Sequence, residues 1–460
     1  GSKALCMQRE TLEIWDRIGI GEWVAQRGTA WSVGRTYFQD TELFSITLPG
    51  SSADHFPPFV NISQSEVEQV LVQRAIAHEQ ITIHYGQTLL GVDQGDASVT
   101  LLGASSGGCR ITGRYGVAAD GARSQVRKLL GIEFPGHSHA DRFLIADIRA
   151  ELPFPAERRF WFDPPFNPGR TVLIHPQPDG IWRIDWQVPS EFDLDAERES
   201  GRLERRIRQV VGDVDYEEVW LTVYRFHQRC AQRWREGRIF LAGDAAHLMS
   251  PFGARGLNSG VADAANLAWK LEYALTGKGP ESLLDSYSEE RLAAARENLA
   301  VTNETMRFMA PPPDFRAERD AILQASRTDP SARSAVNSGR LATPMVYAGG
   351  LFAPHRPDDP QLVGSVLVDV QTADGSRLRR HLAGAGGQWL ALTTDHGAPE
   401  VPPGVVGLAD GSSAVRAVYA PDGRTRTWLI RPDGYIAACT EPRAAEVRAA
   451  WLAGLAPTEV

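Results

Sequence analysis

The pattern of hydrophobic and polar positions changes along the chain, and each change predicts a different kind of structure. Up to residue 142, apolar residues at helical spacing predict helices near 12–18 and 63–77. Alternating runs predict strands over 31–48, 81–85, 89–92, 98–102 and 114–119. From 143 to 229, short strands surround one charged helix near 196–211, which predicts a mostly antiparallel sheet. Its strands are expected over 143–148, 159–162, 171–174, 182–187 and 219–224.

A second change comes after this sheet. A buried strand over 237–242 runs into a glycine-rich turn and then into two long helices, over 256–275 and 281–302. Three consecutive prolines at 311–313 end this pattern, because proline cannot continue a helix, and a helical connector extends from there to about residue 340. Beyond it, alternating strands and turns and an alanine-rich helix over 443–455 predict a separate small α/β domain.

Composition narrows the class of protein. The 460 residues are enough for about three domains. A net charge of -9 argues against a nucleic-acid or membrane-surface partner, and no apolar run is long enough to span a bilayer. The four cysteines lie far apart, form no CxxC pair and have no zinc-like spacing. We therefore expect no metal site and a cytoplasmic location.

The segment 237–260 carries the strongest chemical signal. A hydrophobic strand ends in Gly243 and Asp244, a loop with Pro251 and Gly253 comes next, and a helix begins near Gly256. N–H groups at a helix start are unpaired and partly positive, and glycines let a flat or anionic ligand approach the backbone. From chemistry alone, a plain strand–turn–helix connection with an aspartate cap is an equally open interpretation.

As a whole string, this segment resembles the GD motif of the class A flavoprotein monooxygenases, the para-hydroxybenzoate hydroxylase superfamily. The resemblance implies that Asp244 binds the ribityl chain of FAD. It also implies that Gly256, Leu257 and Asn258 present the helix start to the flavin pyrimidine edge. Pro251 would then lie beside the isoalloxazine ring, near the substrate.

Two further segments resemble parts of the same family. Residues 117–127 look like its DG motif, linked to FAD and NAD(P)H binding, with Asp120, Gly121 and Arg123 at the matching positions. A turn that caps a helix is the alternative. The opening stretch, 1–13, is similar to the segment whose arginine reaches FAD, which implies that role for Arg9, and Gln64 matches the flavin-contacting glutamine. A solvated polar side chain is the alternative for both.

Within this family, segments 141–147, 160–166 and 224–227 resemble the 3-(3-hydroxyphenyl)propionate hydroxylase-like proteins of the phenol hydroxylase branch. Segment 429–435 resembles the thioredoxin-like C-terminal domain of that branch. The resemblance implies an α/β fold with a Rossmann-like FAD-binding domain and an inserted, mostly antiparallel substrate sheet. The expected divisions are 1–30, 61–142 and 231–310 for the FAD-binding domain, 31–60 and 143–230 for the substrate sheet, 311–345 for a helical connector, and 346–460 for a thioredoxin-like domain without CxxC.

One unit that the family leads us to expect is missing. The family begins with a βαβ unit whose G-x-G-x-x-G turn holds the FAD pyrophosphate, but the first residues here match the family segment that lies just after that unit. Three explanations stay open: a part that precedes Gly1 in the whole protein, which we favour, a shortened chain, or loss of the phosphate site. A sheet without that central strand is expected to expose apolar surface on its neighbours.

The resemblance implies an FAD-dependent monooxygenase that uses NADH or NADPH and O₂. It would hydroxylate a phenolic or other small aromatic substrate through a flavin C4a-hydroperoxide, and a homodimer is the expected assembly. Two alternatives stay open: a monooxygenase that tailors a polyketide or antibiotic-type aromatic, and a flavin-free scaffold protein that retains the fold. The catalytic candidates are Pro251, His175 and His227, with Asp163, Tyr224 and Arg183 as further members of a proton relay.

Overall fold

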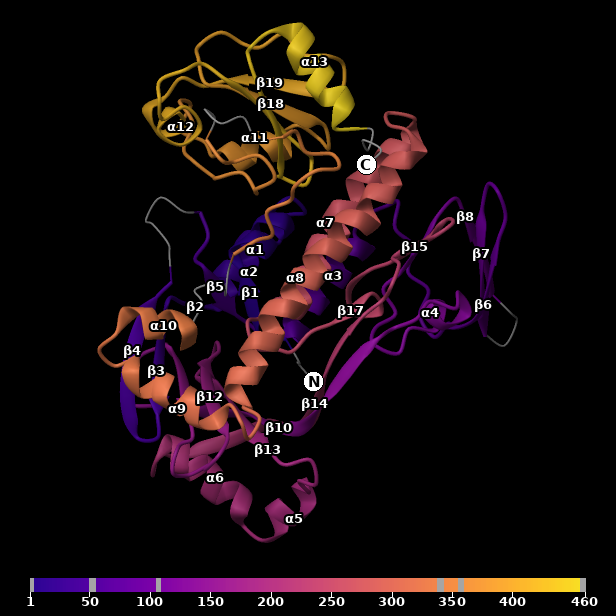
Figure 1. Cartoon of the computed structure of the whole chain (residues 1–460). Coiled ribbons are helices and arrows are strands. Elements are labelled where there is room, and N and C mark those ends of the chain that lie inside the picture. The colour runs from indigo at the N-terminus through magenta and orange to yellow at the C-terminus, as the bar shows by residue number, and fades with distance from the viewer. Residues whose placement is uncertain (1–3, 49–54, 105–108, 337–342, 355–359, 456–460) are drawn as a thin grey trace.

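The computed structural model describes residues 4–48, 55–104, 109–336, 343–354 and 360–455. Figure 1 shows a large sheet with short helices at one end of the molecule and a small C-terminal unit at the other. Two long helices, α7 (Arg255–Thr276) and α8 (Asp285–Met309), run between them. No helix within the described ranges is long and apolar enough to cross a membrane. Residues 1–3 of the opening match, 49–54 of the predicted substrate sheet, and 337–342 and 355–359 lie outside those ranges.

The large sheet has eight strands in the order β17-β14-β10-β13-β12-β11-β3-β4. Its neighbours pair antiparallel except β11 and β3, which run parallel. Segments 33–47 and 136–230 therefore share one mostly antiparallel sheet although they are far apart along the chain. Its strands are β3 (Val33–Phe38), β4 (Thr41–Thr47), β10 (Gly136–Ala150), β11 (Arg158–Phe162), β12 (Thr171–Pro176), β13 (Ile181–Val188), β14 (Tyr216–Cys230) and β17 (His247–Leu248).

Strand alternation gives this sheet two faces with separate cores. We call the face that carries Phe143, Phe160 and Leu173 the inner face. It packs against Phe252 and against side chains from the end of α8 and from α9. The outer face, with Ile184 and other apolar residues, packs against α6. Both faces of the sheet are thus covered, and the inner face is turned toward the glycine-rich loop that comes after Asp244.

Three small sheets and several helices complete the part of the chain before residue 337. The sheets are β1 (Cys6–Gln8)-β5 (Phe59–Asn61)-β2 (Thr29–Trp31), β6 (Thr88–Gln94)-β7 (Val99–Ala104)-β8 (Cys109–Gly113), and β15 (Arg235–Glu236)-β16 (Ile239–Leu241)-β9 (Gly116–Ala118). Within the described residues β9 is an edge strand, and its Val117 is 49% exposed. The shorter helices are α1 (Arg9–Asp16), α2 (Gly21–Arg27), α3 (Gln64–Ile76), α4 (Gln125–Leu129), α5 (Leu194–Glu199), α6 (Arg202–Val211), η1 (Gly243–Ala245), η2 (Glu281–Leu284), α9 (Arg316–Ala325) and α10 (Pro330–Val336).

The C-terminal unit is a four-stranded mixed sheet in the order β19-β18-β20-β21. Strand β18 runs parallel to β19 and antiparallel to β20, and β20 pairs antiparallel with β21. One core joins this sheet to Trp269 and Tyr273 of α7, so the unit packs on the long helices. Its elements are α11 (Leu378–Gly384), β18 (Trp389–Thr393), β19 (Val405–Ala409), α12 (Ser413–Tyr419), β20 (Thr427–Ile430), β21 (Ile436–Thr440) and α13 (Ala444–Ala453).

Several expected elements differ from the structure. Residues 81–85 form no strand. The helix expected over 196–211 is broken into α5 and α6 because Gly201 adopts a left-handed conformation with φ of 70°. The helix expected over 281–302 starts with η2 and continues as α8 to Met309, just before the prolines. Strand β8 is missing from the sequence prediction because its short, largely polar sequence shows little alternation.

Candidate active site

The glycine-rich loop of segment 237–260 leads into an unusual helix start. Gly243, just beyond strand β16, has a φ of 59°, and the Asp244 next to it is exposed. The residue before α7, Ala254, has a φ of 53°, a conformation that is strained for alanine. Ala254, at the N-cap position, has no side chain that could cap the first N–H groups of α7, and the first turn of this helix holds no acidic residue. A helix of 22 residues thus presents an uncapped, partly positive end beside an exposed carboxylate.

A buried ion network holds this loop in place. Asp263 of α7 is fully buried and accepts hydrogen bonds from the Gly243 N–H (3.0 Å) and from Arg291 Nε (2.7 Å). His247 Nε2 lies 2.8 Å from the same carboxylate. Burial alone would raise the pKa of Asp263, but the charges of Arg291 and His247 reverse this and hold it below its ordinary value. Asp263 is therefore ionised and positions Gly243, and with it Asp244.

Asn258, in the first turn of α7, joins the helix to strand β1. Its Oδ1 accepts from the Gln8 N–H (3.0 Å) and the Thr11 hydroxyl (2.6 Å), and its Nδ2 donates to the Cys6 carbonyl (3.0 Å) and to the Ala254 carbonyl. These four bonds use the whole hydrogen-bonding capacity of an asparagine side chain. Asn258 can therefore face a flavin only through its backbone, and its side chain acts by positioning.

The other residues expected to contact FAD lie close to these two structures. Arg9 Nε donates to the Phe56 carbonyl (3.0 Å), and Gln64 Oε1 accepts from the Ala4 N–H (3.0 Å) on the segment just before β1. Leu257 packs with the apolar residues of α1 and β1. Gly256 has open space around it, since a Cβ added there would meet no heavy atom within 4 Å. The structure thus gathers these residues around β1 and the start of α7.

The segment of the predicted DG motif is tied to the loop by a residue that sequence reasoning did not select. Asp120 Oδ2 accepts from the N–H groups of Gln125 (2.7 Å) and Val126 (3.1 Å), so this carboxylate caps α4. Arg127 is 5% exposed and donates to the Ala245 carbonyl (2.7 Å) and the Ala122 carbonyl (2.9 Å). Its guanidinium thereby joins the segment 117–127 to the loop that comes after Asp244. The left-handed Gly121 has open space around it, and Arg123 is exposed.

The inner face of the large sheet also carries polar side chains, and we call five of them the polar cluster: Asp147, Arg158, His175, Arg183 and Asp185. Arg183 donates from Nε and Nη2 to the two Asp147 oxygens at 2.8 Å each and lies opposite His175 in the β12–β13 register. Burial, and then the charges of Arg158 and Arg183, lower the pKa of His175 well below its ordinary value, so its ring is neutral at pH 7. Burial raises the pKa of Asp185 to about 7.

The remaining candidates for a proton relay are dispersed. His227 alternates away from Phe226, which packs on the inner face, and its Nδ1 lies 2.8 Å from the Ser138 hydroxyl. Asp163 accepts from Arg319 Nη2 of α9 at 2.8 Å. Tyr224 lies near Asp244, and burial and that charge raise its pKa. The structure therefore brings His175 and Tyr224 to the inner face and leaves His227 apart from the loop.

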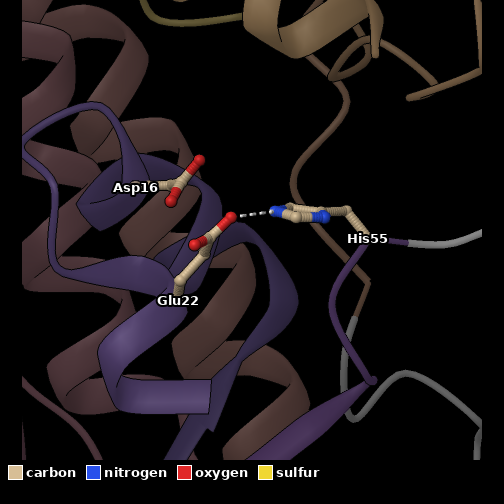
Figure 2. Close-up of side chains that lie close together, drawn as sticks. All are labelled: Asp16, Glu22 and His55. Atoms are coloured by element: carbon tan, nitrogen blue, oxygen red, sulfur yellow. Dashed lines mark ion pairs between the residues drawn. The ribbon is translucent and has the colours of Figure 1, made fainter. Parts of the chain in front are cut away.

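Two other features could attract a ligand, and the second of them is lined in part by Gln8 and Asn258, so it borders the predicted site. Figure 2 shows Asp16, Glu22 and His55, whose possible metal-ligating atoms lie within 4.8 Å of one another; all three are exposed. A cavity of about 80 Å³ lies between α1, α7, α8 and the C-terminal unit and includes Arg291 and Asp433 in its lining. Neither feature contains a member of the polar cluster.

The residues around the loop fit FAD, because the open, uncapped start of α7 suits the electron-rich flavin edge and the exposed Asp244 can accept from ribityl hydroxyls. A single aspartate at a strand end would suit many ligands. The uncapped helix start, the strained Ala254 and the glycines with open space together point to a flat ligand that approaches the backbone.

Comparisons with known proteins agree with this fit. The family described as "FAD binding domain" matches residues 1–302. The chain is 29% identical over 475 residues to the probable NADH-specific resorcinol 4-hydroxylase of Rhodococcus jostii (strain RHA1), covering 94% of this chain and 84% of that protein. It is 31% identical over 408 residues to 3-(3-hydroxy-phenyl)propionate/3-hydroxycinnamic acid hydroxylase 2 of Burkholderia vietnamiensis (strain G4 / LMG 22486), covering 85% and 71%.

Among solved structures, OxyS anhydrotetracycline hydroxylase from Streptomyces rimosus matches with a TM-score of 0.74 and 26% identity, over 96% of this chain and 88% of that one. The sequence and the structure thus lead to the same group of proteins. The chain belongs to the FAD-binding-domain family and, within it, is an FAD-dependent aromatic hydroxylase of the class A flavoprotein monooxygenases, with NADH or NADPH as co-substrate.

Proposed function

We propose that this protein hydroxylates a phenolic ring that lies between the loop before α7 and the inner face of the large sheet. The observation that carries the proposal is the uncapped start of α7 beside the exposed Asp244, directly next to an aromatic-rich sheet face. When bound, FAD supplies the redox chemistry that activates O₂. The residues of this chain must then hold the cofactor, exclude water and orient the ring.

Residues of the described structure are positioned for each of these three tasks. Asp244 would bind the ribityl chain, and the N–H groups at the start of α7 would stabilise negative charge on the pyrimidine edge. Phe143, Phe226 and Phe252 form an aromatic group whose ring centroids lie 4.7–5.9 Å apart. Such a group excludes water from the neighbouring reaction space. It also offers an apolar wall to a small aromatic molecule.

The proposal is tested by loading the purified protein with FAD and supplying NADH or NADPH together with a panel of phenols. We expect the two visible absorption bands of oxidised flavin after reconstitution, and faster oxidation of the nicotinamide with a phenolic product that has gained one oxygen atom. Oxidation without an oxygenated product from any phenol would refute the proposed reaction. Failure to bind FAD would instead favour a flavin-free scaffold.

A second candidate function is the tailoring of a larger, polyketide-type aromatic. It is favoured by the similarity to OxyS anhydrotetracycline hydroxylase, which extends over 96% of this chain. The same product assay with anhydrotetracycline separates the two functions. Hydroxylation of this polycyclic compound, with no turnover of simple phenols, would select the second candidate.

We also propose finer features that the resemblance implies. The C-terminal sheet would be a thioredoxin-like unit, and β9 and β16 would belong to a Rossmann-like sheet, which their parallel pairing supports. The domain divisions at 30, 60, 142, 230, 310 and 345, a homodimer and a cytoplasmic location remain predictions. Sedimentation at several concentrations tests the dimer, and limited proteolysis tests the divisions.

A further inference from the structure

The polar cluster contains two charges that have no partner in the described structure although strand pairing brings them to one face. Arg158 lies on the same face of β11 as Phe160, and Asp185 lies opposite Leu173 in the β12–β13 register. Phe160 and Leu173 are themselves paired and both belong to the inner-face core. Arg158 and Asp185 therefore point to the same side of the sheet, two strands apart.

Neither charge forms a direct hydrogen bond or ion pair with the described residues, although each acts on the other through space and Arg183 also acts on Asp185. The guanidinium of Arg158 lies 5.2 Å from the Phe160 ring centroid and has no ion pair or hydrogen bond there, whereas Arg183 is bound by Asp147. The Asp185 carboxylate likewise has no hydrogen bond or ion pair with described residues. Burial lowers the pKa of Arg158 and raises that of Asp185, so each neutral form is favoured relative to water.

A third polar group on the inner face, the imidazole of His175, also lacks a hydrogen-bond partner in the described structure. His175 is only 7% exposed, and its Nδ1 has no hydrogen-bond partner in the described structure. Buried polar atoms in proteins are nearly always paired, so the unpaired Nδ1 of His175 indicates a missing partner. Arg158 and Asp185 are half-buried on the same face, where a ligand could reach both charges. Arg183 is the internal contrast, because it sits on the same face and is paired with Asp147 through two hydrogen bonds.

Arg158 and Asp185 lie near residues that are expected to bind the flavin. Cys6 of β1 is close enough to Arg158, Arg183 and Asp185 for all three charges to influence its pKa, which burial raises to about 12. The Cys6 carbonyl in turn accepts a hydrogen bond from Asn258 in the first turn of α7. The unpaired charges thus lie on the side of the sheet that faces the proposed flavin edge.

We propose that Arg158 and Asp185 are the two polar anchors of the substrate: Arg158 pairs with an anionic substituent of an aromatic acid, and Asp185 accepts a hydrogen bond from its ring hydroxyl. The inference rests on the proposed function, because it assigns a substrate to the same site. Strands two apart are separated by roughly 10 Å. A single aromatic ring with a short acidic side chain can bridge that span between two polar side chains, and the apolar neighbours Phe160 and Leu173 would contact the ring.

The experiment measures equilibrium binding to the FAD-loaded protein without a nicotinamide, so that no turnover occurs. Three probes differ by one group each: 3-(3-hydroxyphenyl)propionate, its neutral amide, and 3-phenylpropionate, which lacks the hydroxyl. Arg158→Met should weaken binding of the hydroxy acid by about 10- to 100-fold and leave the amide nearly unchanged. Asp185→Asn should weaken the hydroxy acid and leave 3-phenylpropionate nearly unchanged.

Arg159→Met is the matched control, because Arg159 is the next residue on β11, points to the other face and pairs with Glu157 at 2.7 Å. It should bind all three probes like the parent protein. Equal weakening of acid and amide by Arg158→Met, or no binding of any probe to the parent, would overturn the inference. If phenols lacking an acid group are still hydroxylated in the product assay, the proposed function survives that result.

Discussion

The buried network around Asp263 allows a stability prediction whose size can be worked out from the structure. Asp263→Asn keeps the shape of the side chain and one acceptor oxygen, but it removes the anion that pairs with Arg291. Both side chains are almost completely buried, with side-chain exposures of 0% and 4%. Removing one member of a buried ion pair costs about 3–5 kcal/mol, because the other charge stays buried without compensation. The unfolding equilibrium constant should then rise by roughly two to four orders of magnitude.

Urea denaturation at pH 7 measures this loss. The matched control is Asp285→Asn, because Asp285 pairs with Arg235 at 2.7 Å but has a side-chain exposure of 58%. An exposed pair of this kind contributes under about 1 kcal/mol. If Asp263→Asn destabilises the protein no more than Asp285→Asn does, the assignment of Asp263 as an ionised, central residue is refuted.

The same network has a pH signature with a defined sign. The pKa of Asp263 is lowered in the folded state, so its stabilisation is complete above its unfolded pKa and is lost as pH falls through the folded value. The parent protein should therefore lose stability on acidification more steeply than Asp263→Asn does. Parallel pH profiles for the two proteins would contradict the reasoning even if the variant were less stable at pH 7.

Three further predictions concern single residues. Asp244→Ala should weaken FAD binding by about 10- to 100-fold, since a charge-assisted acceptor is lost, and unchanged affinity in a spectroscopic titration would reject the proposed role. Asp185→Asn should be more stable than the parent by about 1–3 kcal/mol at pH 8 and equal at pH 3. Burial raises the Asp185 pKa to about 7, so the parent loses stability as pH rises from the unfolded pKa of about 3.9 through this value. Burial opposes ionisation of Glu290, but Arg431 and Lys270 lower its pKa to about 2. The parent should therefore lose stability between pH 4.5 and 2 more steeply than Glu290→Gln does by calorimetry, because only the parent protonates Glu290 in this window.

Local patterns in the sequence predicted the elements whose signals are complete within a short segment. The alternation over 182–187 gives β13, and the glycine-rich run ending near Gly256 gives the start of α7 to within one residue. The prediction of helix bounds fails where the conformation of a single residue breaks the helix, as at Gly201, which separates α5 from α6. The helix pattern alone does not show that this glycine adopts a positive φ.

The residues that hold the loop could not be found in this way because their partners are distant in sequence. Arg127 contacts Ala245, 118 positions away, and Asp263 contacts Arg291 on the next helix. Each is an ordinary polar residue in its own helix, and only packing shows that it is buried. The family motifs therefore indicate where a cofactor is held, whereas the clamp that shapes its site becomes visible only in the fold.

The polar cluster was also only partly predictable from the sequence. Alternation along β13 already separates Trp182, Ile184 and Trp186 from Arg183 and Asp185, so the sequence indicates that one sheet face carries charge. The strands β11, β12 and β13 follow one another both along the chain and in the sheet, so their order could be expected. Their register could not, because it depends on where each turn begins: Leu173 pairs with Phe160 on one side and with Asp185 on the other. Only this register sets the spacing between Arg158 and Asp185. If these two residues anchor the substrate as proposed, substrate choice depends on strand register, and exchanging residues within one motif should change cofactor affinity before it changes which substrate is bound.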